Sequence, residues 1–222
     1  MIYSPFTLLL FFVLLALLGL FLVLVEMRVL AYAYRKVGVR PRYAFAVMLL
    51  SLLGSHVNIP LYAIPAQRLL RPRELSMFGR TYIVPEIAEQ GATVVALNVG
   101  GALIPILVSL YLLGRTRLYG RMAIGVALVA VVVHSLAQIV PGVGIAVPMF
   151  IPPLVAAGVG LLLAFRRAPP VAYVSGSMGT LVGADLLNLG RITELGAPIV
   201  SIGGAGTFDG VFLTGIIAGL LA

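Results

Sequence analysis

Long apolar runs separated by short polar segments follow one another along the whole chain. A run of about 20 apolar residues is long enough to cross the hydrocarbon core of a bilayer as a helix. We therefore expect an all-α fold, a polytopic membrane helix bundle that forms a single domain over residues 1–222. The pattern predicts about seven spans, namely Pro5–Val25, Tyr43–Ala66, Gly91–Leu113, two within Met122–Phe165, Pro170–Leu189 and Phe208–Ala222.

Polar or glycine-rich segments interrupt these runs. Gln67–Gln90 is the longest of them and is expected to form a loop with room for one interfacial helix. Pro141–Pro148 separates the two spans within Met122–Phe165. Gly190–Gly206 ends in PIVSIGGAG, which predicts a short β-strand or hairpin and then a re-entrant bend before the last helix.

The last predicted helix, Phe208–Ala222, is short for a membrane span. Its length is roughly 22 Å, which is less than the thickness of the hydrocarbon core. The glycine bend before it must therefore enter the protein to complete the crossing. Irregular backbone at membrane depth is tolerated only where it is buried in protein or lines water. The sequence thus predicts a hydrated recess beside the start of this helix.

Composition agrees with a membrane protein. The chain is 61% hydrophobic and 10% charged, and its mean hydropathy is +1.14. A soluble domain carries roughly 25% charged residues. The chain has no cysteine, which excludes disulfides, a thiolate nucleophile and cysteine metal ligands. The N-terminal run lacks a clear basic region and cleavage site, so we expect it to be a retained helix rather than a signal peptide.

The net charge of +8 comes from arginines in short loops and does not indicate nucleic-acid binding. If seven spans alternate, ten of the 15 basic residues fall on one side, in Arg28–Arg42, Arg115–Arg121 and Arg166–Arg167. Basic loops usually face the cytoplasm. We therefore expect a multi-pass protein of a prokaryotic cytoplasmic (inner) membrane, with the N-terminus outside and the C-terminus inside.

Asp185 and Asp209, the aspartates of the chain, both fall within predicted spans. From the rise of a helix, Asp185 lies roughly 22 Å and Asp209 roughly 20 Å above the inner boundary of the core. Both are therefore predicted in the outer half of the bilayer, on neighbouring antiparallel helices. An ionisable group at such a depth is a functional-site hypothesis, because burying its charge is costly.

Two carboxylates in a recess of low dielectric share a proton, since both cannot ionise cheaply. The ionised member can activate water while the protonated member donates to a carbonyl group, as in aspartic proteases. The predicted strand can pair with an unwound transmembrane peptide by β-augmentation. We expect Asp185 and Asp209 to be catalytic. The residues expected to contact the substrate are Asn188, Ile199, Ser201, Gly203, Gly204 and Gly206.

Residues 203–219, GGAGTFDGVFLTGIIAG, resemble the second-aspartate helix of the GxGD intramembrane aspartyl proteases, the presenilin, signal peptide peptidase and prepilin peptidase group. In that group one aspartate lies on a preceding helix and the other follows a glycine-rich turn, and Asp185 and Asp209 occupy these two places. Phe208 stands where the group has glycine. The resemblance implies an intramembrane aspartic endopeptidase without a cofactor. The whole chain is also similar to uncharacterised bacterial and archaeal membrane proteins of unknown function.

A second interpretation of the same residues is a cation site. His56, His134, Asp185 and Asp209 form a ligand set suited to a divalent cation such as zinc. Helices broken by glycine bends are also typical of transporters. The alternative function is therefore transport or binding of a divalent cation or small solute. A third interpretation is a packing protein, in which polar side chains join helices and Asp209 caps its helix. The expected partners are the bilayer and a transmembrane peptide, not nucleic acid.

Overall fold

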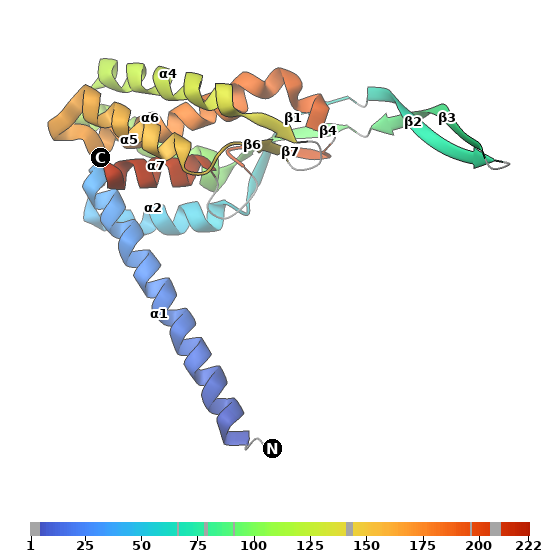
Figure 1. Cartoon of the computed structure of the whole chain (residues 1–222). Coiled ribbons are helices and arrows are strands. Elements are labelled where there is room, and N and C mark those ends of the chain that lie inside the picture. The colour runs from blue at the N-terminus through green and yellow to red at the C-terminus, as the bar shows by residue number, and fades with distance from the viewer. Residues whose placement is uncertain are drawn as a thin grey trace.

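A computed structural model describes residues 5–65, 67–77, 80–90, 92–140, 144–195, 197–204 and 210–222. Most of these residues are helical, and small β-elements gather at one end of a helix bundle (Figure 1). The α-helices are α1 (Pro5–Val37), α2 (Pro41–Gly54), α3 (Ile104–Thr116), α4 (Tyr119–Leu136), α5 (Ile151–Ala164), α6 (Ala168–Thr180) and α7 (Gly210–Leu221).

Shorter helical segments and strands connect the α-helices. The π-helical segments are η1 (Val99–Leu103) and η3 (Leu181–Asp185), and the 3-10 segments are η2 (Phe165–Arg167) and η4 (Leu186–Leu195). The strands are β1 (Asn58–Ile64), β2 (Gln67–Met77), β3 (Arg80–Gln90), β4 (Thr93–Asn98), β5 (Gln138–Val140), β6 (Gly144–Ala146) and β7 (Ile199–Ile202).

Helix α6 lies at the centre of the bundle, because α1, α3, α4, α5 and α7 all contact it. Almost all of its residues are buried, including Tyr173 and the polar residues Ser175 and Ser177. The helix is rich in alanine, glycine and serine, whose small side chains let neighbouring helices approach closely. At Gly179, an added Cβ would lie 2.6 Å from the Cβ of Val129 on α4, which is too close for two carbon atoms.

Four helical stretches within the described ranges are long and apolar enough to cross a membrane, namely Leu8–Val37, Val99–Thr116, Tyr119–Leu136 and Ile151–Ile192. Helices α2 and α7 are apolar but shorter. The N-terminal part of α1 leaves the bundle (Figure 1), and its leucine and phenylalanine side chains are exposed. These features are compatible with a membrane protein, as the sequence predicts. The number of seven spans stays a prediction.

A three-stranded sheet has the order β1-β4-β7 and closes one end of the bundle. Strand β4 pairs antiparallel with β1 and parallel with β7, with Val95 opposite Val200. The side chain of Thr93 adds a hydrogen bond of 3.0 Å to the backbone oxygen of Ala197, just before β7. Strands β5 and β6 form a short hairpin, and β2 and β3 form a longer one that projects away from the bundle (Figure 1).

The predicted span Tyr43–Ala66 is wrong beyond Gly54, where α2 ends and the chain continues into β1. Proline inside a helix removes a hydrogen bond and clashes with the preceding turn. Pro60 instead lies at an irregularity in the β1–β4 register, a position in an edge strand that tolerates proline. The predicted span Gly91–Leu113 is also wrong at its start, because Thr93–Asn98 form β4.

The predicted loop Gln67–Gln90, with its interfacial helix, is likewise corrected. The segment forms β2 and β3, which pair antiparallel from Gln67 opposite Gln90 to Met77 opposite Arg80. The flanking strands explain this course. Because β1 and β4 pair with Ile64 opposite Thr93, the chain between them leaves the sheet and returns beside itself.

The strand predicted before the last helix is confirmed as β7, and two residues of the predicted bend, Gly203 and Gly204, have φ angles of 85° and 79°. The partner of β7 is β4, which lies far upstream in the sequence, rather than a neighbouring hairpin strand. The predicted helix bundle is therefore confirmed as a mostly helical fold, and the structure adds a small sheet that the apolar runs did not indicate.

Candidate functional site

Asp185 is the last residue of η3, where the helix that begins as α6 widens from α-helical to π-helical winding. The helix then tightens to 3-10 winding in η4. Such irregular turns occur frequently at functional sites. The half-buried Asp185 side chain reaches the bend after β7, where the backbone N–H of Gly203 donates to Oδ2 at 2.7 Å. The structure thus brings together the first predicted aspartate and the predicted glycine bend.

Glycine is required at this bend for two physical reasons. The φ angle of Gly203 lies in the left-handed region, which costs energy for any residue with a Cβ. The bend also packs directly on η1, where an added Cβ on Gly101 would overlap the backbone oxygen of Gly203. The contact between these two backbones sets the position of the N–H group that meets Asp185.

A cavity of about 460 Å³ opens beside Asp185. Its walls come from β7, the connection between β6 and α5, the segments η3 and η4, and the start of α7. The lining is mainly apolar, and the polar side chains among the described lining residues are Thr180, Asp185, Ser201 and Thr214. Concave, mostly apolar pockets of a few hundred Å³ with a few convergent polar groups are typical ligand sites.

Thr180 is a cavity residue that the sequence analysis did not identify. Its hydroxyl oxygen is buried and makes no hydrogen bond within the described ranges of the chain. A buried polar group left without a partner costs about 1–3 kcal/mol. The hydroxyl is therefore available to water or to a ligand group in the cavity. Nothing in the sequence marks this threonine, because the π-helical turn that separates it from Asp185 is visible only in the structure.

The residues predicted to contact a substrate divide into three groups. Ile199, Ser201 and Gly204 line the cavity, and Gly203 contacts Asp185. Asn188 is not among the lining residues. Its side-chain amide instead donates to the backbone oxygens of Ala184 at 2.8 Å and Gly183 at 3.3 Å, within its own helix. Gly206 lies outside the described residues.

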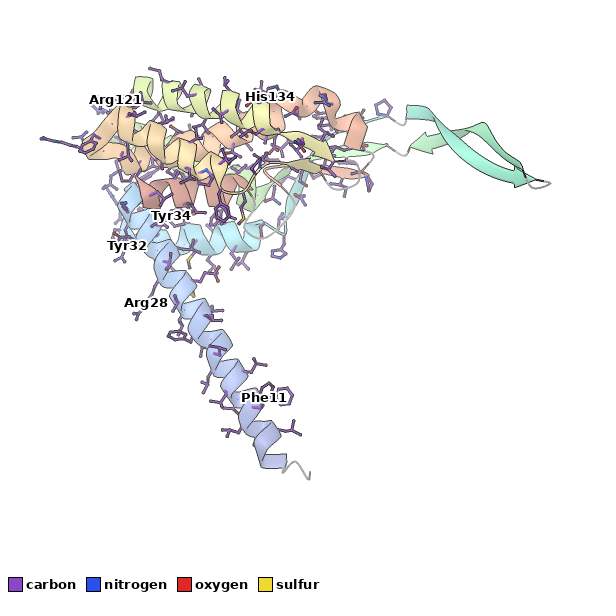
Figure 2. All side chains as sticks on the ribbon, in the orientation of Figure 1. Phe11, Arg28, Tyr32, Tyr34, Arg121 and His134 are labelled. Atoms are coloured by element: carbon purple, nitrogen blue, oxygen red, sulfur yellow. The ribbon has the colours of Figure 1, made fainter. Side chains whose placement is uncertain are left out.

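The two histidines lie in different parts of the fold. His134 is an exposed residue at the sheet end of α4 (Figure 2), where its Nδ1 lies 3.4 Å from Nδ2 of Asn188. His56 follows α2, with its Nδ1 3.3 Å from Oγ of Ser55. Across the part of the chain that the structure describes, no three His, Cys, Asp or Glu side chains gather into a group that could hold a metal ion.

The second predicted aspartate, Asp209, lies outside the described residues. Gly210, the next residue in the sequence, is the first residue of α7 and lines the same cavity as Asp185. The chain therefore returns to the cavity wall directly after Asp209. Thr214, one turn further along α7, also lines the cavity and is buried.

Asn98 is a buried residue that holds β4 in place. Its amide nitrogen donates to the backbone oxygen of Ser55 at 2.8 Å and to Oδ1 of Asn58 at 3.0 Å. Its own Oδ1 accepts from the backbone N–H of Gly101 at 2.7 Å and so caps η1. Asn98 therefore joins α2, β1 and β4, and it positions the glycine on which the Gly203 bend rests.

Comparison with known proteins places the chain in a family, but the function of that family is unknown. No curated protein and no solved structure matches the chain. The model of a family described as a protein of unknown function, DUF1614, matches residues 52–221. This match covers the sheet, helices α3 to α7 and the whole cavity lining. The chain therefore belongs to the DUF1614 family of proteins of unknown function.

Proposed function

We propose that this protein is an intramembrane aspartyl-protease-like hydrolase that uses Asp185 and Asp209 as paired carboxylates in the outer half of the bilayer. The observation that supports this proposal most directly is the position of Asp185. Its carboxylate lies at a largely apolar cavity that is also lined by strand β7 and by Gly210, the residue that follows Asp209. The similarity of residues 203–219 to the GxGD proteases supports the same pairing.

The proposed substrate is a transmembrane peptide that binds in an extended form beside β7. Strand β7 is the last strand of its sheet and pairs through one edge with β4, and no other strand within the described ranges pairs with it. Ile199 and Ser201 of this strand line the cavity. An added strand would satisfy its backbone groups through main-chain hydrogen bonds, which matters because unpaired peptide groups are costly in an apolar environment.

The proposed chemistry uses the two carboxyl groups with one shared proton. The ionised carboxylate takes a proton from water while the hydroxyl oxygen bonds to the peptide carbonyl carbon, and the protonated carboxyl donates to the carbonyl oxygen. The C–N bond then breaks, and the leaving nitrogen takes a proton from the carboxyl that received one from water. One hydroxyl of the tetrahedral intermediate returns its proton to the other carboxylate as the new carbonyl forms, which restores the shared proton. The hydroxyls of Thr180 and Thr214 at the cavity wall are suited to hold the water.

The proposal includes a location. We infer a multi-pass protein with seven spans in a bacterial or archaeal cytoplasmic membrane, with its N-terminus outside and its C-terminus inside. The grouping of basic segments supports this orientation. Lys36 donates to the backbone oxygen of Leu220 at 2.6 Å, and Arg121, Arg166 and Arg167 line one hollow. These basic residues lie at the end of the bundle away from the hairpin, where Figure 2 labels Arg121. Basic loops are concentrated on the cytoplasmic side of membrane proteins.

The decisive experiment uses the full chain in proteoliposomes with a transmembrane peptide reporter. We expect Asp185→Asn and Asp209→Asn each to reduce cleavage to the background rate, because an amide can neither accept a proton from water nor share one. Asparagine retains an oxygen that can accept from the N–H of Gly203, so the Asp185 variant should keep its melting temperature. Glu26→Gln is the control, because Glu26 lines a different cavity and should leave cleavage unchanged. Cleavage that survives either aspartate change would exclude the proposal.

The second candidate is a carrier of a cation or small solute. The observation that favours it is the pair of π-helical interruptions, η1 and η3, on either side of the Gly203 bend. Interrupted helices form the binding sites of many transporters. If the reporter is not cut while zinc raises the melting temperature of the wild type but not of His134→Ala, the carrier is the better description. A chelator that lowers the melting temperature of the purified protein would support the same conclusion.

A further inference from the structure

A hollow of about 550 Å³ at the end of the bundle away from the sheet is lined by arginines from two separate turns. Arg121 belongs to the first turn of α4. Arg166 and Arg167 belong to η2, which connects α5 to α6. These turns are distant in the sequence, and the packing of α4 against α5 and α6 brings the three residues to the wall of one hollow.

The three guanidinium groups have no partner among the residues that the structure describes. Across the described part of the chain, Arg121, Arg166 and Arg167 make no hydrogen bond or ion pair. Basic neighbours at the same end are engaged, since Lys36 donates to the backbone oxygen of Leu220 and Arg115 donates to the Tyr111 hydroxyl, both at 2.6 Å. The sequence has no acidic residue between Glu89 and Asp185, so no carboxylate on these turns compensates the charge.

Large apolar side chains flank the arginines. Leu118 and Leu163 line the hollow itself. Phe165, next to Arg166, is 81% exposed, and Leu162 is 88% exposed. The surface therefore combines three free cations with an adjacent apolar face. This combination matches an amphiphile with a negatively charged headgroup and hydrocarbon chains, and it does not match a free inorganic anion.

We propose that this hollow binds the phosphate of an anionic phospholipid, with Arg121, Arg166 and Arg167 as its hydrogen-bond donors. Guanidinium groups form paired hydrogen bonds with phosphate oxygens and suit this role better than ammonium groups. Helix α6 contributes few backbone donors of its own, because Pro169 and Pro170 have no N–H. The acyl chains lie along Phe165 and Leu162. The inference is independent of the function proposed for the Asp185 cavity.

The test measures lipid binding to the purified full-length protein by native mass spectrometry. Phosphatidylglycerol is titrated against phosphatidylcholine as the neutral comparison. The variant R121Q/R166Q/R167Q removes the three donors. The matched control R28Q/R40Q/R42Q removes the same charge from the α1–α2 region, outside the hollow. We expect the first variant to bind phosphatidylglycerol at least about tenfold more weakly, because each basic side chain near an anionic lipid surface contributes about fivefold. The control variant should bind phosphatidylglycerol less than about fivefold more weakly than the wild type.

Equal losses in the two triple variants, or equal affinity for both lipids, would overturn the proposal in favour of diffuse charge attraction. Inorganic phosphate provides the third arm. Suppose that millimolar phosphate displaces phosphatidylglycerol and raises the melting temperature of the wild type as much as the lipid does. The hollow is then a site for free phosphate and not for a lipid. If R121Q/R166Q/R167Q does not fold, R121Q and R167Q replace it. Each should weaken binding of phosphatidylglycerol by about fivefold, and no change in either would overturn the proposal.

Discussion

The candidate site depends on a short series of backbone contacts made by individual residues. Asn98 accepts from the N–H of Gly101, Gly101 lies against the backbone oxygen of Gly203, and the N–H of Gly203 donates to Asp185. Each contact requires a particular residue, because a side chain on either glycine would separate the two backbones. The position of the carboxylate is therefore coupled to the buried amide of Asn98 at the end of β4.

Gly101→Ala tests this coupling. The new Cβ would overlap the Gly203 oxygen, and relieving such an overlap requires backbone shifts that cost about 1–3 kcal/mol. We expect a lower melting temperature by far-UV circular dichroism, together with loss of whatever activity the cavity supports. Gly114→Ala is the control, since nothing lies within 4 Å of a Cβ at this position in α3. Alanine there should be neutral or stabilise the helix by up to about 1 kcal/mol. Equal effects of the two substitutions would contradict the proposed contact.

Single residues also show how far the site could be predicted. Asp185 was predictable, because a carboxylate in an apolar run is costly and therefore needs a reason. Asn188 looked equally suitable by residue type, yet its amide is used by its own helix. Thr180 was missed, because a lone threonine in an apolar helix has no distinguishing sequence signal. The π-helical turn at η3 determines which polar side chain faces the cavity, and this turn cannot be predicted from the amino-acid composition of the segment.

At the scale of elements, the errors concentrate where apolar runs form strands. A short buried strand and a segment of buried helix have the same apolar composition, so periodicity alone does not separate them. Strand β4 is such a case, because four of its residues are buried. The proline and asparagine positions in β1 were the better evidence, since both residue types disfavour a helix interior. The partner of β7 was not predictable, because parallel pairing joins segments that are distant in the sequence.

The β4–β7 register can be tested with introduced cysteines, because the chain contains none of its own. Val95 is paired with Val200, and neighbouring strands lie about 5 Å apart, within the range that a disulfide can bridge. We expect Val95→Cys with Val200→Cys to oxidise and to escape maleimide labelling in mass spectrometry. The shifted pair Val95→Cys with Ser201→Cys should stay reactive, since adjacent residues of a strand point to opposite faces. Preferential oxidation of the shifted pair would show a different register.

At the scale of the whole molecule, the bundle has two chemically different ends. One end carries the sheet and the long hairpin (Figure 1), and Figure 2 labels Arg121 at the other end. The Asp185 cavity lies at the first end and the hollow lined by arginines at the second. Helix α1 departs from the bundle in its N-terminal part with an exposed apolar surface. The matched family region begins at residue 52, after most of α2, so it contains the cavity without α1. The proposed catalytic and lipid-binding surfaces are thus separated along the bundle.

The proposed orientation predicts that the two ends lie on opposite sides of the membrane. Gly120→Cys lies at the basic end, where no atom is within 4 Å of a Cβ, and Ala146→Cys lies in the exposed part of β6 at the other end. In intact cells, a membrane-impermeant maleimide should label Ala146→Cys only. After permeabilisation it should label both. Labelling of Gly120→Cys alone in intact cells would reverse the orientation, and labelling of both would contradict a membrane crossing between them.

The sequence by itself determined the long apolar helices that are compatible with a membrane protein, and the strand and glycine bend before α7. It also singled out Asp185 as a candidate site residue. These properties follow from local composition. The length of an apolar run, the free-energy cost of burying a charge and the φ range open to glycine each depend on a short segment of the chain. Only the tertiary structure decided the pairing of β4 with β7, the burial of Asn98, the closing of the cavity and the meeting of three arginines. Each of these joins segments that are distant in the sequence, and their contacts arise from packing around α6 and from the sheet.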